Sequence, residues 1–212
     1  MLRLLAANTR DAYGDVEEVF LPVAVGVFVV VVGAIALMVF LGRRRSEPRS
    51  RANNLPLEAV LVGVLTVTAG LLIAVSFHAE DRVGAAEADA TLRVRLVAAK
   101  WRWRFEYPQQ RVVVQGRDGE IPSLVVPVDT EIDFEGVSLD VIHAFWVPEM
   151  RFQRQLIPQR PTRFAMTFPE TGLLSGGRCS FYCGLRHQDM RFLVEVRSAA
   201  DFRAWAAREA AR

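Results

Sequence analysis

The chain has 212 residues, a length that suits one compact domain with additional segments. Hydrophobic residues make up 51% of it and charged residues 24%, which excludes a disordered or low-complexity chain. The formal net charge is only +2 and gives no support for nucleic-acid binding. Two cysteines and three histidines are too few for a disulfide-dense scaffold or an array of zinc fingers.

Two long apolar runs lie in the first 80 residues. The first spans 20–41 and has 22 residues without a charge, and the second spans 59–77 and has 19. As helices they would be about 33 Å and about 28 Å long, which matches a hydrocarbon core of about 30 Å. The first run is also longer than the apolar part of a signal peptide. We therefore predict a transmembrane hairpin over residues 19–78, preceded by an external segment, 1–18.

The charges that flank the hairpin predict its orientation. The linker 43–58 carries Arg43, Arg44, Arg45, Arg49 and Arg51, whereas the N-terminal flank carries only Arg3 and Arg10. Because arginine-rich loops stay in the cytoplasm, the linker is expected there and both termini outside. The expected location is a bacterial inner membrane, with the C-terminal domain on the periplasmic or equivalent side.

The pattern changes after a polar linker, 79–90. Within residues 91–198, apolar and charged side chains alternate in short stretches separated by glycine and proline, as in half-buried strands. Several short strands in about 106 residues predict an all-β sandwich or barrel. The segment 199–212 is rich in alanine and arginine and predicts a short C-terminal helix.

Both cysteines belong to one run, Cys179-x3-Cys183-x3-His187-x2-Met190, and His143 lies upstream on a predicted strand. Thiolate and thioether ligands favour copper(I), and imidazole binds both oxidation states of copper. A single blue-copper site needs one cysteine, so the second indicates two coppers that share bridging thiolates. Such a site suits electron transfer and leaves no position for a substrate. A disulfide between the cysteines and a structural zinc site are the alternatives, although zinc sites use no methionine.

The hairpin, the aromatic strand and the cysteine run occur in an order that resembles subunit II of the haem–copper oxidases, the cytochrome c oxidase family. This resemblance implies a membrane-anchored, cupredoxin-like sandwich that holds a dinuclear copper centre, CuA. It implies six ligands: His143, Cys179, the backbone carbonyl of Phe181, Cys183, His187 and Met190. It also implies an oxidase that reduces O₂ to water, with subunit I, other oxidase subunits and cytochrome c or a similar soluble donor as partners.

The resemblance extends to residues outside the copper site. The segment from Lys100 to Tyr107 is similar to the family's aromatic segment, whose first tryptophan receives electrons. That residue here is Trp101, and the alternative is that Trp101 belongs to the core with the other aromatic residues of its strand face. Trp103 and Phe105 are expected in the core. Glu58 opens the second helix, where the family has the mouth of a proton channel, although an acidic residue also suits a helix N-terminus.

Glu106 and Asp140 match acidic residues that dock cytochrome c in the family. Residues 92–197, however, hold 15 basic and 12 acidic side chains, so a strongly acidic face is not evident. The family usually has a glutamate that reaches magnesium where this chain has Phe181, and another acidic residue where it has Gln155. The resemblance therefore gives little support for magnesium.

No Cys-x-x-Cys-His motif is present, so no fused c-type haem is expected. Two other functions are open. One is the CuA subunit of a nitric oxide reductase. The other is a membrane-tethered copper carrier or assembly factor, for which five methionines and three histidines are few.

Overall fold

The computed structural model describes residues 9–43, 55–84, 92–116 and 120–212. Contacts within the chain separate a helical unit, 14–79, from a second unit that contains residues 80–212. Arg3 and the linker residues Arg44, Arg45, Arg49 and Arg51 lie outside the described residues.

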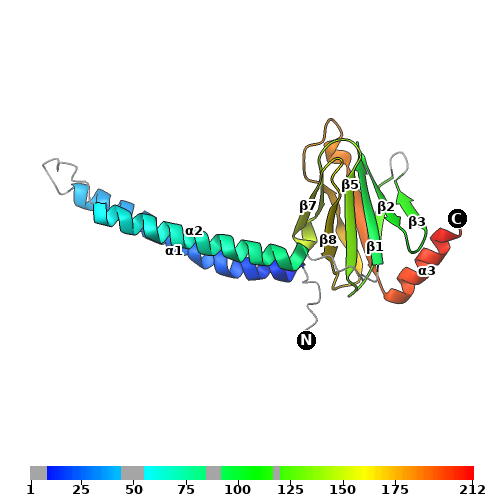
Figure 1. Cartoon of the computed structure of the whole chain (residues 1–212), viewed down its shortest axis with the longest axis horizontal. Helices are drawn as coiled ribbons and strands as arrows, with labels where there is room; N and C mark the ends of the chain where they lie inside the picture. Colours follow the sequence, from blue (N-terminus) through cyan, green and yellow to red (C-terminus); the bar gives the residue numbers. More distant parts are fainter. Residues whose placement is uncertain (1–8, 44–54, 85–91, 117–119) are drawn as a thin grey trace. The chain divides into compact units, whose positions relative to one another are not determined.

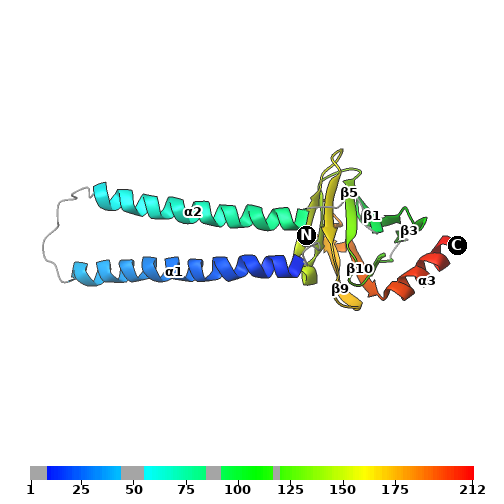
Figure 2. The same cartoon turned by 60° about the horizontal axis from the view of Figure 1, so that its bottom comes forward.

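The helical unit consists of two long helices, α1 (Thr9–Arg43) and α2 (Leu55–Gly84), which run antiparallel (Figure 2). Their segments Tyr13–Leu37 and Glu58–His78 are long and apolar enough to cross a membrane, and none of their most apolar stretches is buried within the chain. A helix that is apolar on every side needs lipid or other protein around it. The helices therefore agree with the predicted hairpin.

Both helices are longer than the charge-free runs from which the hairpin was predicted. Helix α1 begins at Thr9, inside the predicted external segment 1–18, and α2 continues to Gly84, inside the predicted linker 79–90. A charge-free run marks only the part of a helix that fits hydrocarbon. The flanking alanine, glutamate and arginine residues are good helix formers, so the helices continue beyond it.

The second unit is a sandwich of two five-stranded sheets, as the all-β prediction required (Figure 1). The first sheet has the order β3-β2-β1-β5-β8, and the second has the order β4-β10-β9-β6-β7. The first comprises β1 (Leu92–Ala99), β2 (Arg102–Tyr107), β3 (Val112–Gln115), β5 (Ile132–Ser138) and β8 (Thr162–Met166). The second comprises β4 (Ser123–Pro127), β6 (His143–Val147), β7 (Phe152–Leu156), β9 (Gly172–Cys179) and β10 (Arg191–Arg197).

Short helices complete the unit. Two 3₁₀ turns, η1 (Pro148–Met150) and η2 (His187–Asp189), interrupt the connections of the second sheet. The predicted C-terminal helix is α3 (Ala199–Ala210), and its first turn is capped by the Ser198 hydroxyl, which accepts from the Asp201 N–H. Helix α3 packs on the sandwich through Trp205, whose ring lies 5.2 Å from that of Tyr107.

The core between the sheets is largely aromatic. Trp103 and Phe105 are fully buried, as predicted, and both pack edge-on against Phe192 of the second sheet. Phe192 in turn stacks on Phe145 at 4.9 Å. These contacts fix β2, β6 and β10 against one another, and the candidate site lies where β6 and β10 begin.

Candidate metal centre

The predicted ligands gather at one end of the second sheet. His143 begins β6, Cys179 ends β9, and Met190 immediately precedes β10. Phe145 lies opposite Cys179 in the pairing of β6 with β9, so His143, two residues earlier, lies on the same face beside it. The Cys179 N–H donates to the Met190 carbonyl at 2.9 Å and closes the loop that contains the other ligands.

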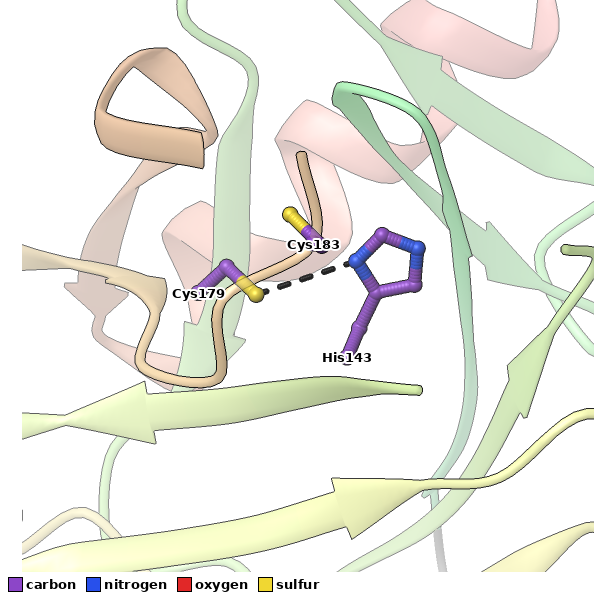
Figure 3. Close-up of side chains that lie close together, drawn as sticks. All are labelled: His143, Cys179 and Cys183. Carbon is purple, nitrogen blue, oxygen red and sulfur yellow. Dashed lines mark hydrogen bonds between the residues drawn. The ribbon is translucent and has the colours of Figure 1, made fainter. Parts of the chain in front are cut away.

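Cys179 lies between two of the predicted ligands. Its Sγ is 3.7 Å from Nδ1 of His143 and 3.2 Å from the carbonyl oxygen of Phe181. Figure 3 shows the His143 ring turned towards the two cysteine sulfurs. The His143 nitrogen and the sulfurs of Cys179 and Cys183 all lie within 4.8 Å of one another.

Cys183 contacts the remaining two predicted ligands. Its Sγ is 3.5 Å from Nδ1 of His187 and 3.9 Å from Sδ of Met190. The fold thus brings together all six predicted donors, from positions that span 48 residues of sequence between His143 and Met190.

The site is closed to molecules of substrate size. His143 and Met190 are completely buried, and Cys179 and Cys183 are only 3% and 4% exposed, whereas His187 is half-buried. Both cysteines are free thiols, so the structure does not contain the disulfide considered from the sequence. A closed group of donors suits an ion that exchanges electrons rather than one that binds a substrate.

Asp140 orients the buried histidine. Its carboxylate lies 2.7 Å from Nε2 of His143 and accepts hydrogen bonds from the N–H groups of Lys100 and Val141. Burial raises the pKa of Asp140, but these hydrogen bonds outweigh burial and bring the pKa below its ordinary value. The ionised carboxylate holds the imidazole with Nδ1 facing the sulfurs, as carboxylates commonly do behind metal-binding histidines.

The two thiols differ in acidity. Burial raises the pKa of Cys179, but hydrogen bonds with His143 and nearby backbone groups outweigh burial and lower it overall. Burial raises the pKa of Cys183, and the neighbouring Cys179 raises it further. Burial lowers the pKa of His143, but its bonds to Cys179 and Asp140 outweigh burial and raise it. Cys179 is therefore the thiol that ionises first. A bound metal ion would displace the remaining proton from Cys183.

Two tryptophans of one segment donate hydrogen bonds to the loop from Cys179 to Met190, called the ligand loop here. The Trp101 indole N–H donates to the Cys183 carbonyl at 3.2 Å, and the Trp103 N–H donates to the Met190 carbonyl at 3.3 Å. Trp101 also covers Gly184, where φ is +119° and an added Cβ would lie 3.1 Å from the indole ring. The bond made by Trp103 was not predicted; the Trp-x-Trp spacing, with two indole donors on one strand face, was the available signal.

The other predicted residues lie outside the cluster. Glu106 forms ion pairs with Arg104 at 2.8 Å and with Arg95 at 3.6 Å. Glu58 is an exposed side chain in the first turn of α2. Gln155 is an exposed residue of β7, paired with Ala144 in the sheet. The contact between the Asp140 carboxylate and His143 was also not predicted. The available signal was an acidic residue three positions before a candidate histidine ligand.

The donor set fits copper. It consists of two thiols, two imidazole nitrogens, a thioether and a carbonyl oxygen, which are soft or intermediate ligands. Structural zinc sites are completed by cysteine and histidine and leave no role for the buried Met190 sulfur, 3.9 Å from Cys183. No Asp or Glu belongs to the cluster of close potential ligands in the described part of the chain, which disfavours magnesium or calcium at this position.

Comparisons with known proteins agree with this geometry. The family model for the periplasmic domain of cytochrome c oxidase subunit II matches residues 92–197. Cytochrome c oxidase subunit 2 of Corynebacterium diphtheriae is 26% identical over 73% of this chain, and the protein of the same name from Bacillus subtilis is 28% identical over 71%. The alignments cover 58% and 42% of those relatives, so the chain matches only part of their length.

A solved structure shows the same sandwich. The periplasmic domain of subunit II of cytochrome oxidase (CoxB) from Bradyrhizobium japonicum superimposes with a TM-score of 0.53 and 27% sequence identity. The match covers 57% of this chain and 94% of that domain.

Proposed function

Because the chain belongs to the cytochrome c oxidase subunit II family, we propose that it is the electron-transfer subunit of a membrane-bound haem–copper oxidase. In this proposal it accepts electrons from a soluble donor and passes them to the catalytic haem–copper subunit, which reduces O₂ to water. The observation that carries the proposal is the convergence of all six predicted donors in one closed cluster.

We propose that His143, Cys179, the Phe181 carbonyl, Cys183, His187 and Met190 hold two copper ions. Bound there, the copper pair would supply a site that accepts and releases one electron. The protein's own groups prepare the site: the aromatic core excludes water, Asp140 orients His143, and the Cys179–Met190 backbone bond fixes both ends of the loop.

We propose that Trp101 is the residue at which electrons enter. Its indole is half-buried and therefore reaches the surface, while its N–H donates to the carbonyl of Cys183. This single hydrogen bond links a surface ring to a ligand residue. Trp103 is completely buried, which suits it to the core instead.

The membrane placement and the partners are also proposals. The arginine-rich linker would be cytoplasmic in a bacterial inner membrane, and the sandwich would face the periplasm, in line with the domain named by the family model. The exposed apolar surfaces of α1 and α2 support contact with lipid, subunit I and other oxidase subunits. Glu58 at the start of α2 would lie at the mouth of a proton channel.

The two alternative functions are not favoured. The relatives from Corynebacterium diphtheriae and Bacillus subtilis are named as oxidase subunits, not as subunits of nitric oxide reductases. A copper carrier should release its metal readily, whereas four of the six donor residues here are buried.

Metal analysis and optical spectra of the full chain, purified in detergent with the subunits that accompany it, test the proposal. We expect about two coppers per chain, no zinc, and the near-infrared absorption of a mixed-valence pair. O₂ consumption in the co-purified complex should far exceed its turnover of nitric oxide. One copper per chain, or a Cys179–Cys183 disulfide in the native protein, would contradict the proposal.

A further inference from the structure

A hollow in the surface beside Trp101 is lined mainly by cationic side chains. Lys100, Arg102, Arg186 and Arg191 contribute four positive charges. Among the described residues, two carboxylates, Glu120 and Asp189, line the same hollow. All six charged side chains are exposed to solvent. We call this surface, formed by the four cations around Trp101, the basic hollow.

The positive charge of the hollow is only partly neutralised. Asp189 forms an ion pair with Arg186 at 3.4 Å. Within the described residues, no carboxylate forms an ion pair with Lys100, Arg102 or Arg191. Arg191 instead donates to the Gln188 carbonyl at 3.0 Å, which fixes its position without reducing its charge. The hollow therefore carries a net positive charge that attracts anionic surfaces.

The basic hollow lies directly against the ligand loop. Trp101 lines it and donates to the carbonyl of Cys183, so a molecule seated there contacts a ring one hydrogen bond from a ligand residue. Leu185, next to Arg186 on the same loop, is 89% exposed. A small apolar contact inside a charged rim is the usual anatomy of a transient protein interface.

The acidic residues expected to dock the donor are engaged elsewhere. Asp140 accepts three hydrogen bonds, one of them from the Lys100 backbone, and its carboxylate faces His143. Glu106 is held by Arg95 and Arg104. Neither Asp140 nor Glu106 is among the described residues that line the hollow, so the four cations still outnumber the carboxylates there.

We propose that the basic hollow docks a soluble one-electron carrier protein whose redox group is surrounded by acidic side chains. This inference rests on the proposed function, because it names the class of donor for the same site. In the transfer the donor is oxidised by one electron and the copper pair is reduced by one, and no bond is made or broken. Opposite charges would speed the encounter and orient the donor over Trp101.

A matched pair of probes tests the charge of the partner. Native mitochondrial cytochrome c has a lysine-rich face, and succinylation of its lysines makes the same haem protein acidic. Binding of each to the full chain is measured with every redox centre oxidised, so that no electron moves. We expect the succinylated form to bind more tightly, and its Kd to rise with ionic strength because exposed charges are screened.

Variants locate the surface. The double variant Lys100→Gln/Arg102→Gln should raise the Kd of succinylated cytochrome c about three- to tenfold at low salt and slow copper reduction by a similar factor. The control Arg203→Gln/Arg208→Gln removes the same charge from α3, which follows the opposite end of β10 from the ligand loop. It should change both quantities less than about twofold. Copper content should be unchanged in both.

Each contrary outcome has a defined meaning. Tighter binding of native cytochrome c, weakened by Glu106→Gln, would overturn the basic hollow and leave the proposed function intact. Equal losses in the two double variants would also overturn it, because the attraction would then come from net charge alone. If Lys100→Gln/Arg102→Gln instead released a co-purified oxidase subunit, the hollow would be a subunit contact and the inference would fall. A chain without two coppers would overturn the proposed function itself, whatever the binding result.

Discussion

At the scale of single residues, the ligand cluster combines groups with unequal tasks. The two thiols lie at its centre, each in contact with two other donors, whereas the Met190 thioether contacts only Cys183 among the cysteines. A thiolate is also a much stronger copper ligand than a thioether. Substitutions of the thiol ligands and of the thioether ligand should therefore have different effects on the copper site.

Replacement of Cys179 or Cys183 by serine should abolish the copper pair, because a shared thiolate is lost from both metals. Met190→Leu preserves an apolar side chain of similar volume and should retain copper while changing its redox potential. Copper content and potentiometric titration distinguish the two classes. The same outcome for the cysteine and methionine variants would show that the thiolates do not bridge.

The two tryptophans of the aromatic segment should also behave differently. Trp101→Phe removes a half-buried hydrogen bond to the Cys183 carbonyl and should slow reduction by the donor strongly, with copper content unchanged and a smaller loss of stability than in Trp103→Phe. Trp103→Phe should instead cost about 1–3 kcal/mol of stability through lost packing and a lost buried hydrogen bond. Stopped-flow kinetics and thermal unfolding separate these effects. Unchanged donor kinetics in Trp101→Phe would show that electrons do not enter through that residue.

Asp140→Asn tests the carboxylate behind His143. The loss of negative charge makes the imidazole a poorer donor, so copper affinity should fall about 10- to 100-fold and the redox potential should rise. The control is Asp189→Asn, which removes an exposed carboxylate of the ligand loop that pairs only with Arg186 among the described residues. If both variants shifted the potential equally, general electrostatics rather than orientation of His143 would explain the effect.

At the scale of secondary-structure elements, one side chain joins the two sheets by hydrogen bonds. The Tyr107 hydroxyl on β2 donates to the Val125 carbonyl at 3.0 Å and accepts from the Val125 N–H at 2.9 Å on β4. Burial raises the pKa of Tyr107 above its ordinary value, so the group stays protonated in the folded domain. These two hydrogen bonds thus satisfy the buried N–H and carbonyl groups of Val125.

Tyr107→Phe should destabilise the external domain by about 1–3 kcal/mol, because both backbone groups of Val125 lose their partner. All four tryptophans lie beyond residue 100, so denaturant unfolding followed by their fluorescence reports on this domain alone. The control Tyr182→Phe removes a hydroxyl from a side chain that is 80% exposed and should cost about 0.5 kcal/mol or less. Equal costs would contradict the bridging role.

The same tyrosine predicts a loss of stability in alkali. Above pH about 10 the unfolded chain releases its tyrosine proton while the folded domain retains it, so stability must fall as the pH rises. Tyr107→Phe should remove this part of the alkaline loss. Unfolding curves measured from pH 8 to 11 test the difference.

At the scale of the whole molecule, the charge pattern predicts orientation. In sealed inverted vesicles the cytoplasmic face is outside, so trypsin should cleave the arginine-rich linker between the helices and leave residues 92–212 protected. Detergent should make that domain accessible and serves as the control. Digestion of the C-terminal domain in intact vesicles would reverse the proposed topology.

The helical hairpin, the β-sandwich and the donor residues could be predicted from the sequence because each depends on a local sequence pattern. A run of 22 uncharged residues, period-two alternation and the spacing Cys-x3-Cys-x3-His-x2-Met each depend on neighbours in the chain. The structure confirms the predicted fold class, a helical hairpin followed by a β-sandwich. It also brings the six predicted donors together at one end of the second sheet. The apolar runs did not indicate where the helices end, because α1 begins at Thr9 and α2 ends at Gly84, in segments that carry no hydrophobic signal.

The sequence by itself determined the class of fold and the chemistry of the donors, since residue type and local periodicity suffice for both. Only the tertiary structure decided what Asp140, Trp101 and Lys100 face. Asp140 and Lys100 are 40 residues apart, and Trp101 and Cys183 are 82 apart, yet both pairs are hydrogen-bonded. Such contacts depend on how two sheets pack and how a loop closes between them. For that reason the sequence alone did not indicate that the Asp140 carboxylate contacts His143 or that cationic side chains lie around Trp101.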